Sequence, residues 1–343
     1  MKMRSQVVRD QLLRRMEESH LSIALQGIAR MGRDSDDVYA PLAIVASIDK
    51  VVLLSEWGTH KANWKILKKL YSPFHVDRSY VPEGRMPGYR VKLVKELPEC
   101  RIDIFTDAVD RHPPCLMEVH FRAGKTLQQY KEHLQELNKN LPHLKVSIVE
   151  YTLDVFCLDY VGVQRLFRAL RKYAYFPYQR TAILHGRDEH TWGDKFRMNM
   201  TYRVGDVKFY ERGPDGKRKE GYWNLADTDR VRLEYTAKRP MLAKYGINVL
   251  RDFTDGPQFH AINNKIYSFK CFKGSRILPH YGKAYTARDE KGNDGCFQLE
   301  LNHCRHDVKN VHQYMQDVRQ LDTFKSELRR AMADFDTQWQ RLT

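Results

Sequence analysis

Long apolar runs are missing from the 343-residue sequence, and none approaches the roughly 20 residues that a membrane-spanning helix needs. Residues 1–15 are charged and contain no apolar stretch of the kind found in signal peptides. The six cysteines form no Cys-x-x-Cys pair, which argues against a zinc ribbon. Cys296, Cys304 and His306 lie near one another, but their spacing matches no common zinc pattern, so we expect structural roles for them. These absences predict a cytoplasmic protein with free thiols and no membrane partner.

Acidic residues are in deficit, because 43 Asp and Glu stand against 58 Lys and Arg and give a formal charge of +15. A basic excess of this size favours a polyanionic partner, since neutralised phosphates supply most of the non-specific affinity of DNA-binding proteins. A basic protein without such a partner is the alternative. With 42% hydrophobic residues the chain can bury a core, arranged as one large domain or two ordinary ones.

Apolar periodicity divides the chain into three regions. Helical spacing predicts a helical arm over residues 1–46, and an amphipathic helix over 307–342 within a C-terminal region, 251–343. Between them, residues 47–250 alternate strands with helices. The expected strands are 48–54, 89–94, 101–106, 116–121, 146–156, 207–211 and 230–237, and the expected helices are 61–71, 126–138 and 161–173. This order predicts an α+β fold, a central antiparallel sheet with helices packed on one face.

Strand alternation predicts a polar face on this sheet. Residues i and i+2 of a strand point to the same side, so each strand divides into an apolar and a polar set. The polar sets collect Glu118, His120, Glu150, Asp154, Lys208, Tyr210, Arg232 and Glu234. Carboxylates with a histidine suit Mg²⁺ or Mn²⁺, and a tyrosine beside such an ion is a plausible nucleophile. The solvated face of an ordinary antiparallel sheet shows the same alternation and is the alternative.

A resemblance to a known family rests on five stretches within residues 48–246. In order they read IDKVVLL, RIDIFTDAVDRHPPCLMEVHFRAGKTL, VEYTLDVF, VKFYERG and DRVRLEYTAKRPMLAKYGI. The segment resembles the replication initiator endonucleases of filamentous phages and the related rolling-circle initiators of plasmids and transposons. The resemblance implies an HUH-type nuclease fold. It also implies that a tyrosine attacks a DNA phosphodiester, leaving a 5′-phosphotyrosine link and a free 3′-hydroxyl that primes a host polymerase.

The resemblance also implies roles for individual residues. The strand of the family's nucleophilic tyrosine aligns with VKFYERG, which implicates Tyr210, while metal or acid positions match Glu118, Asp154 with Glu150, and Glu234. The sequence departs from the wider superfamily at its His-hydrophobe-His motif, where Glu118-Val119-His120 stands instead. This departure puts the metal ligand set in doubt. Tyr235 is the main rival nucleophile, but it is expected to point to the opposite face from Glu234.

We expect phosphoryl transfer with a divalent ion, Mg²⁺ or Mn²⁺, as the cofactor. Tyr210 is the expected nucleophile, and Glu118, His120 and Asp154 hold the ion. Glu150 or Glu234 completes the ligand set or accepts a proton, and Lys208 and Arg232 offset phosphate charge. The expected DNA contacts are Arg165, Arg168, Arg171, Lys172, Arg212, Lys217, Arg218, Lys219 and Arg232, with DNA as partner and a host helicase and polymerase by family analogy. Two alternatives remain: a non-catalytic DNA-binding regulator on the same fold, and an unrelated basic RNA- or DNA-processing enzyme.

Overall fold

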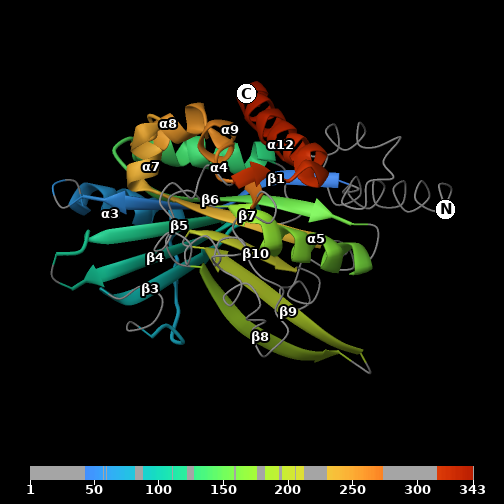
Figure 1. Ribbon diagram of the computed structural model, residues 1–343. Coiled ribbons are helices and arrows are strands. Elements are labelled where there is room, and N and C mark those ends of the chain that lie inside the picture. The colour runs from blue at the N-terminus through green and yellow to red at the C-terminus, as the bar shows by residue number, and fades with distance from the viewer. Residues whose placement is uncertain are drawn as a thin grey trace.

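A ten-stranded antiparallel sheet with helices on one face forms the framework of the computed structural model (Figure 1). The structure describes residues 43–56, 58, 60–81, 88–109, 111–121, 127–157, 160–175, 182–192, 195–204, 206–211, 230–272 and 315–342. The α+β class and the antiparallel sheet flanked by helices are therefore confirmed. Residues 1–42, the basic loop with Arg212, Lys217, Arg218 and Lys219, and Cys296, Cys304 and His306 lie outside the described residues.

Every pair of neighbouring strands in this sheet is antiparallel. In spatial order the strands are β2 (His75–Val76), β3 (Tyr89–Glu96), β4 (Cys100–Ala108), β5 (Cys115–Phe121), β1 (Ala43–Ser55), β6 (Lys145–Phe156), β11 (Arg230–Lys238), β10 (Val207–Glu211), β9 (Lys195–Val204) and β8 (Ala182–Trp192). The sequence did not predict the β8–β9 hairpin. It also placed residues 43–46 in a helical arm, whereas they form the start of β1.

Helices gather on one side of the sheet, with α8, α9 and α12 above it in the view of Figure 1, and the β8–β9 hairpin forms the lower end of the sheet. They are α3 (His60–Tyr71), α4 (Leu127–Asn140), α5 (Tyr160–Tyr173), α7 (Arg239–Lys244), α8 (Leu250–Asp255), α9 (Phe259–Asn263), η4 (Arg319–Leu321) and α12 (Asp322–Arg341). A small second sheet joins β7 (Ala174–Tyr175), β12 (Ser268–Phe272) and β13 (Met315–Asp317). The C-terminal helix thus begins later than the sequence predicted, after a short strand and a 3₁₀ turn. No described helix has both the length and the apolar character that a membrane crossing requires.

The helices cover the apolar set of every central strand. In β6, Val149, Tyr151, Leu153 and Val155 are fully buried and share one core with Leu166 and Phe167 of α5 and Trp339 of α12. Burial of each such side chain contributes about 1.5–3 kcal/mol to stability. Because successive side chains of a strand alternate, the polar residues between them point to the opposite side of the sheet.

The described C-terminal elements belong to the same core as the sheet. The Tyr151 hydroxyl in β6 donates to the Pro257 carbonyl at 2.5 Å, and the Trp339 indole donates to the Thr254 carbonyl at 2.9 Å. Asp336 of α12 accepts the backbone N–H groups of Phe259 and His260, both at 2.8 Å. Residues 251–272 and 315–342 therefore complete the cover over the central strands.

A β-bulge in β1 changes which residues face the polar side. Ile48 pairs with Tyr151 and Lys50 pairs with Glu150. Asp49 is therefore an extra residue in β1, between two residues whose partners are adjacent in β6. An extra residue of this kind lets consecutive side chains point to the same face. Asp49 and Lys50 both contact residues of the polar face, as described below.

Candidate functional site

The eight polar residues that alternation grouped together lie on the side of the sheet opposite the helices. Lys208, Glu234, Thr152 and Ser47 are aligned across β10, β11, β6 and β1. In the next row, Tyr210 pairs with Arg232 and Arg232 with Asp154, while His120 and Glu150 each pair with Lys50 further along β1. The side chains form two clusters on this face.

The first cluster is centred on Glu234. The Tyr210 hydroxyl donates to Glu234 Oε2 at 3.1 Å, and Lys208 forms an ion pair with Glu234 Oε1. Glu234 is buried, and Tyr210 is half-buried. This network brings together a phenol that could act as a nucleophile, a carboxylate that could accept its proton and an ammonium group that could offset negative charge.

The phenol of Tyr210 is not easily ionised in this cluster. Burial raises the pKa of Tyr210 well above its usual 10, and the charges of Glu234, Asp49 and Asp154 raise it further, against a lowering by Arg232. The hydroxyl therefore carries its proton at neutral pH. A reaction at Tyr210 needs a base, and Glu234 already accepts the hydroxyl hydrogen.

Arg232 lies buried beside Tyr210 and is held by two carboxylates. Its Nε and Nη2 donate to Asp154 at 2.8 and 2.6 Å, and its Nη1 donates to Asp49 at 3.0 and 2.8 Å. Arg230 Nε is 3.5 Å from Asp154. Burial opposes ionisation of Asp154, but the charges of Arg232 and Arg230 outweigh it and lower the Asp154 pKa. Arg232 was predicted to contact DNA; in the structure it holds Asp49 and Asp154 in place, with 3% of its surface exposed.

The second cluster is built from Asp103 of β4 and Glu118 and His120 of β5. His120 Nε2 is 3.2 Å from Glu118 Oε2 and 3.7 Å from Asp103 Oδ2, and the three residues form a group that could hold a metal ion. Adjacent ligands on an octahedral ion with bonds of about 2.1 Å lie about 3.0 Å apart, so these spacings are compatible with one ion.

Cations already surround the carboxylates of this second cluster. Lys50 Nζ lies 3.2 Å from Glu118 and 3.1 Å from Glu150, so it bridges the two. Asp103 is 3.1 Å from Lys92 and 2.7 Å from Arg101. Burial raises the pKa of Glu150, against the lowering charge of Lys50. The carboxylates are therefore compensated before any ion binds.

The four predicted metal ligands do not meet around one point. Glu118 and His120 join Asp103, Glu150 joins Lys50, and Asp154 joins Arg232 and Arg230. Three strands, β1, β6 and β11, lie between β5, which carries Glu118, and β10, which carries Tyr210. At about 4.8 Å per strand the lateral separation is roughly 19 Å. An ion at Asp103, Glu118 and His120 would therefore not touch the Tyr210 oxygen.

The predicted DNA-binding helix lies on the other face of the sheet from Tyr210. Arg165 and Arg168 of α5 are exposed, and Leu166 and Phe167 of the same helix pack into the core that covers Phe209. Arg171 and Lys172 fall within α5, but their side chains are outside the described residues. Tyr235, the rival nucleophile, is also on this covered face, where it belongs to the apolar core.

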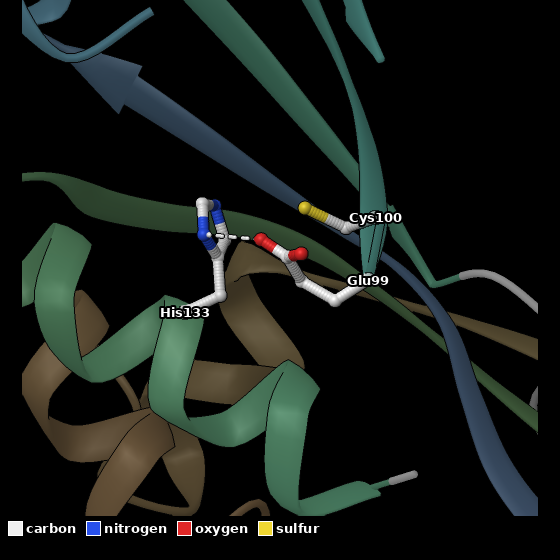
Figure 2. Close-up of side chains that lie close together, drawn as sticks. All are labelled: Glu99, Cys100 and His133. Atoms are coloured by element: carbon white, nitrogen blue, oxygen red, sulfur yellow. Dashed lines mark ion pairs between the residues drawn. The ribbon is translucent and has the colours of Figure 1, made fainter. Parts of the chain in front are cut away.

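A third group of ionisable side chains lies between α4 and the start of β4. Figure 2 shows His133 of α4 pointing toward Glu99 and Cys100 at the start of β4. His133 Nδ1 is 3.3 Å from Glu99 Oε1, and the ligand atoms of all three residues lie within 4.8 Å of one another. Burial lowers the pKa of His133 and raises the pKa of the Cys100 thiol.

Sequence reasoning missed Asp49, Lys50 and Asp103 on the polar face and the whole group of Glu99, Cys100 and His133. Two adjacent polar residues in the apolar strand IDKVVLL were the available signal for the bulge at Asp49. No signal pointed to the third group, because Cys100 and His133 come from distant parts of the chain and match no zinc spacing.

No protein-family model matches the chain, and comparison with curated proteins also yields no match.

Proposed function

We propose that this protein is a DNA-nicking endonuclease of the rolling-circle initiator type, with Tyr210 as nucleophile. The observation that carries the proposal is the hydrogen bond from Tyr210 to Glu234 beside Lys208. It joins the one tyrosine that the family resemblance implicates to a base and a cation. The formal charge of +15 supports a polyanionic substrate.

The proposed reaction is a transesterification. The Tyr210 oxygen attacks the phosphorus as its proton passes to Glu234, and the bond from phosphorus to the 3′-oxygen breaks. In this proposal Lys208, which pairs with Glu234, offsets charge on the phosphate and gives a proton to the departing 3′-oxygen. The products are a 5′-phosphotyrosine link and a free 3′-hydroxyl, which a host polymerase and helicase would use. Because burial raises the pKa of Tyr210, proton transfer to Glu234 is required.

A divalent ion on this face has one described place, at Asp103, Glu118 and His120. There it would bind another phosphate of the same strand, since the strand spacing puts it roughly 19 Å from Tyr210. In this proposal the first cluster alone supplies the base, Glu234, and the positive charge, Lys208, for the attack. Mg²⁺ or Mn²⁺ would therefore affect substrate binding more than proton transfer.

Tyr210→Phe tests the nucleophile. The wild type is expected to nick supercoiled DNA in the presence of Mg²⁺ or Mn²⁺ and to remain covalently attached, as seen on a denaturing gel. The variant is expected to lose both. Tyr235→Phe is the matched control, because it removes a hydroxyl from the other face of the adjacent strand and should retain both. Undiminished nicking by Tyr210→Phe would refute the proposal. Binding of DNA by the wild type without any covalent adduct would instead favour the DNA-binding regulator.

Glu234→Gln separates the base from the nucleophile. The amide keeps a hydrogen-bonding group beside Tyr210 but cannot take its proton at neutral pH. We expect nicking to slow by about 10²–10⁴-fold while DNA affinity changes little. Circular dichroism checks the fold of the variant, since Glu234 is buried and paired with Lys208. A nicking rate equal to that of the wild type would remove Glu234 from the mechanism.

A further inference from the structure

We propose that Glu99, Cys100 and His133 form a Zn²⁺ site that joins β4 to α4 on the helical side of the sheet. The three ligand atoms lie within 4.8 Å of one another, and His133 Nδ1 is 3.3 Å from Glu99 Oε1 (Figure 2). Ligand bonds of about 2.0–2.3 Å at tetrahedral angles place neighbouring ligand atoms about 3.3–3.8 Å apart. The distance from His133 to Glu99 falls in this range, and the ligand atom of Cys100 lies within 4.8 Å of both.

The kinds of ligand select the metal. A thiolate with an imidazole and a carboxylate suits Zn²⁺, whereas Mg²⁺ and Ca²⁺ prefer oxygen ligands alone. The cluster of Asp103, Glu118 and His120 has no sulfur, so the two groups should differ in metal preference. On binding, the Cys100 thiol gives its proton to the buffer as the zinc–sulfur bond forms. The three protein ligands leave a fourth position for water.

A second residue already orients the histidine. The Tyr71 hydroxyl of α3 is 3.3 Å from His133 Nε2, the ring nitrogen that does not face Glu99. Histidines that bind metals commonly hydrogen-bond through their other ring nitrogen, which fixes the ring in the coordinating orientation. Tyr71 and Cys100 are both buried, so their side chains have little freedom to rotate away from His133.

Charge around the group also favours a dication. In the described part of the chain no lysine or arginine forms an ion pair with Glu99, whose partner there is the His133 imidazole. Glu118 and Asp103, by contrast, are paired with Lys50, Lys92 and Arg101. Glu136, one turn further along α4, adds a second negative charge near His133. A Zn²⁺ ion bound at Glu99 would thus meet negative charge that no lysine or arginine offsets, whereas an ion bound at Asp103 and Glu118 would meet carboxylates already paired with cations.

Metal binding to the full chain tests the proposal. The protein is stripped with a chelator, dialysed, and titrated with ZnCl₂ alone and with CoCl₂ alone. We expect one tightly bound equivalent, and a thiolate-to-cobalt charge-transfer band in the near ultraviolet. Cys100→Ser should abolish that band, and His133→Gln should strongly weaken metal binding. The matched controls Cys115→Ser, another buried strand cysteine of the same core, and His120→Gln, in the second cluster, should leave both unchanged.

Tyr71→Phe tests the orienting contact, and a loss of about 10–100-fold in Zn²⁺ affinity is expected. Glu99→Gln, at a half-buried position, provides a ligand variant if Cys100→Ser fails to fold. Absence of Zn²⁺ uptake by the wild type overturns the proposal. So does binding that survives Cys100→Ser and His133→Gln and disappears with His120→Gln. The site is independent of nicking, so Tyr210→Phe should bind Zn²⁺ as the wild type does.

Discussion

Asp154 illustrates how a single buried carboxylate depends on its partners. Arg232 holds it with two hydrogen bonds, and Arg230 lies close by, so the folded state favours the ionised form despite burial. Removing one member of a buried pair leaves the other charge uncompensated, which typically costs about 3–5 kcal/mol. The stability of the sheet near Tyr210 should therefore depend on the ionisation of this one group.

Asp154→Asn should reduce the free energy of unfolding by about 3–5 kcal/mol at neutral pH. The Asp154 pKa is lowered on folding, so its stabilisation is fully present above the usual value of 3.8 and is lost as the pH falls through the lowered value. Urea unfolding at a series of pH values should therefore show the difference between wild type and variant shrinking below about pH 4. Asp206→Asn, which removes a more exposed ion pair with Lys238, should cost less than about 1 kcal/mol. If the difference in unfolding free energy between wild type and Asp154→Asn stayed constant below pH 4, the stabilising role of ionised Asp154 would be contradicted.

At the same scale, side-chain alternation was enough to predict which residues share the polar face. It could not predict their partners. Glu118 meets Lys50 and Asp103, and Asp154 meets Arg232, because strands distant in sequence are neighbours in the sheet and are paired in a particular register. A grouping by face therefore overestimated how closely Glu118 and Asp154 approach each other.

Among the elements, α9 begins at a carboxylate from another helix. Asp336 of α12 accepts the N–H groups of Phe259 and His260, which have no acceptor within their own helix. Burial raises the pKa of Asp336, while these hydrogen bonds oppose the shift. The contact fixes the start of α9 and attaches α12 to the cover of the sheet.

Asp336→Ala should lower the free energy of unfolding by about 1–2 kcal/mol, the usual cost of losing a helix N-cap. Asp336→Asn keeps one acceptor and should cost less. Thermal and chemical unfolding of the two variants measures the difference. Asp334→Ala, on the same helix, controls for the change in α12 itself. Equal losses from Asp336→Ala and Asp334→Ala would show that the cap contributes nothing.

Elements with strong periodicity were predicted within a few residues, as β6, β10 and α5 show. The exceptions have physical causes. Residues 43–46 continue β1 because they pair with β6, and pairing between distant segments is not visible in local propensity. The strands β8 and β9 stabilise each other as a hairpin at the sheet edge, and their polar composition hides the alternation that marks a half-buried strand.

For the molecule as a whole, α12 closes the apolar side of the sheet. Phe335 and Trp339 are buried within the larger of the described apolar cores, Trp339 packs edge-to-face with Phe253, and its indole donates to the Thr254 carbonyl. The sheet then separates two environments, with the packed helices on one side and the charged network on the other. The predicted DNA contacts Arg165 and Arg168 lie on the helical side, so one short DNA segment cannot meet them and Tyr210 together across the sheet.

Trp339→Ala should reduce the free energy of unfolding by about 3–5 kcal/mol, because it removes a fully buried indole and leaves a cavity. Denaturant unfolding followed by circular dichroism measures the loss. Trp339→Phe should recover part of it, since the ring contacts remain and the hydrogen bond to Thr254 is lost. If the alanine variant unfolds at the same denaturant concentration as the wild type, α12 is not part of the cooperative core.

The extra residue in β1 changes which residues of that strand face the polar side of the sheet. Before Asp49 the odd-numbered residues Val45 and Ser47 align with the polar side; after it the even-numbered Lys50 and Val52 do so. Deletion of Asp49 would leave Ile48, Lys50 and Val51 in regular alternation, because Ile48 and Lys50 already pair with adjacent residues of β6. Ile48 and Val51 would then keep their places in the core, and the loss would be confined to the contact between Asp49 and Arg232. Deletion of a regularly paired residue such as Val51 would instead turn the following part of the strand over, so it should harm the protein more than the loss of Asp49.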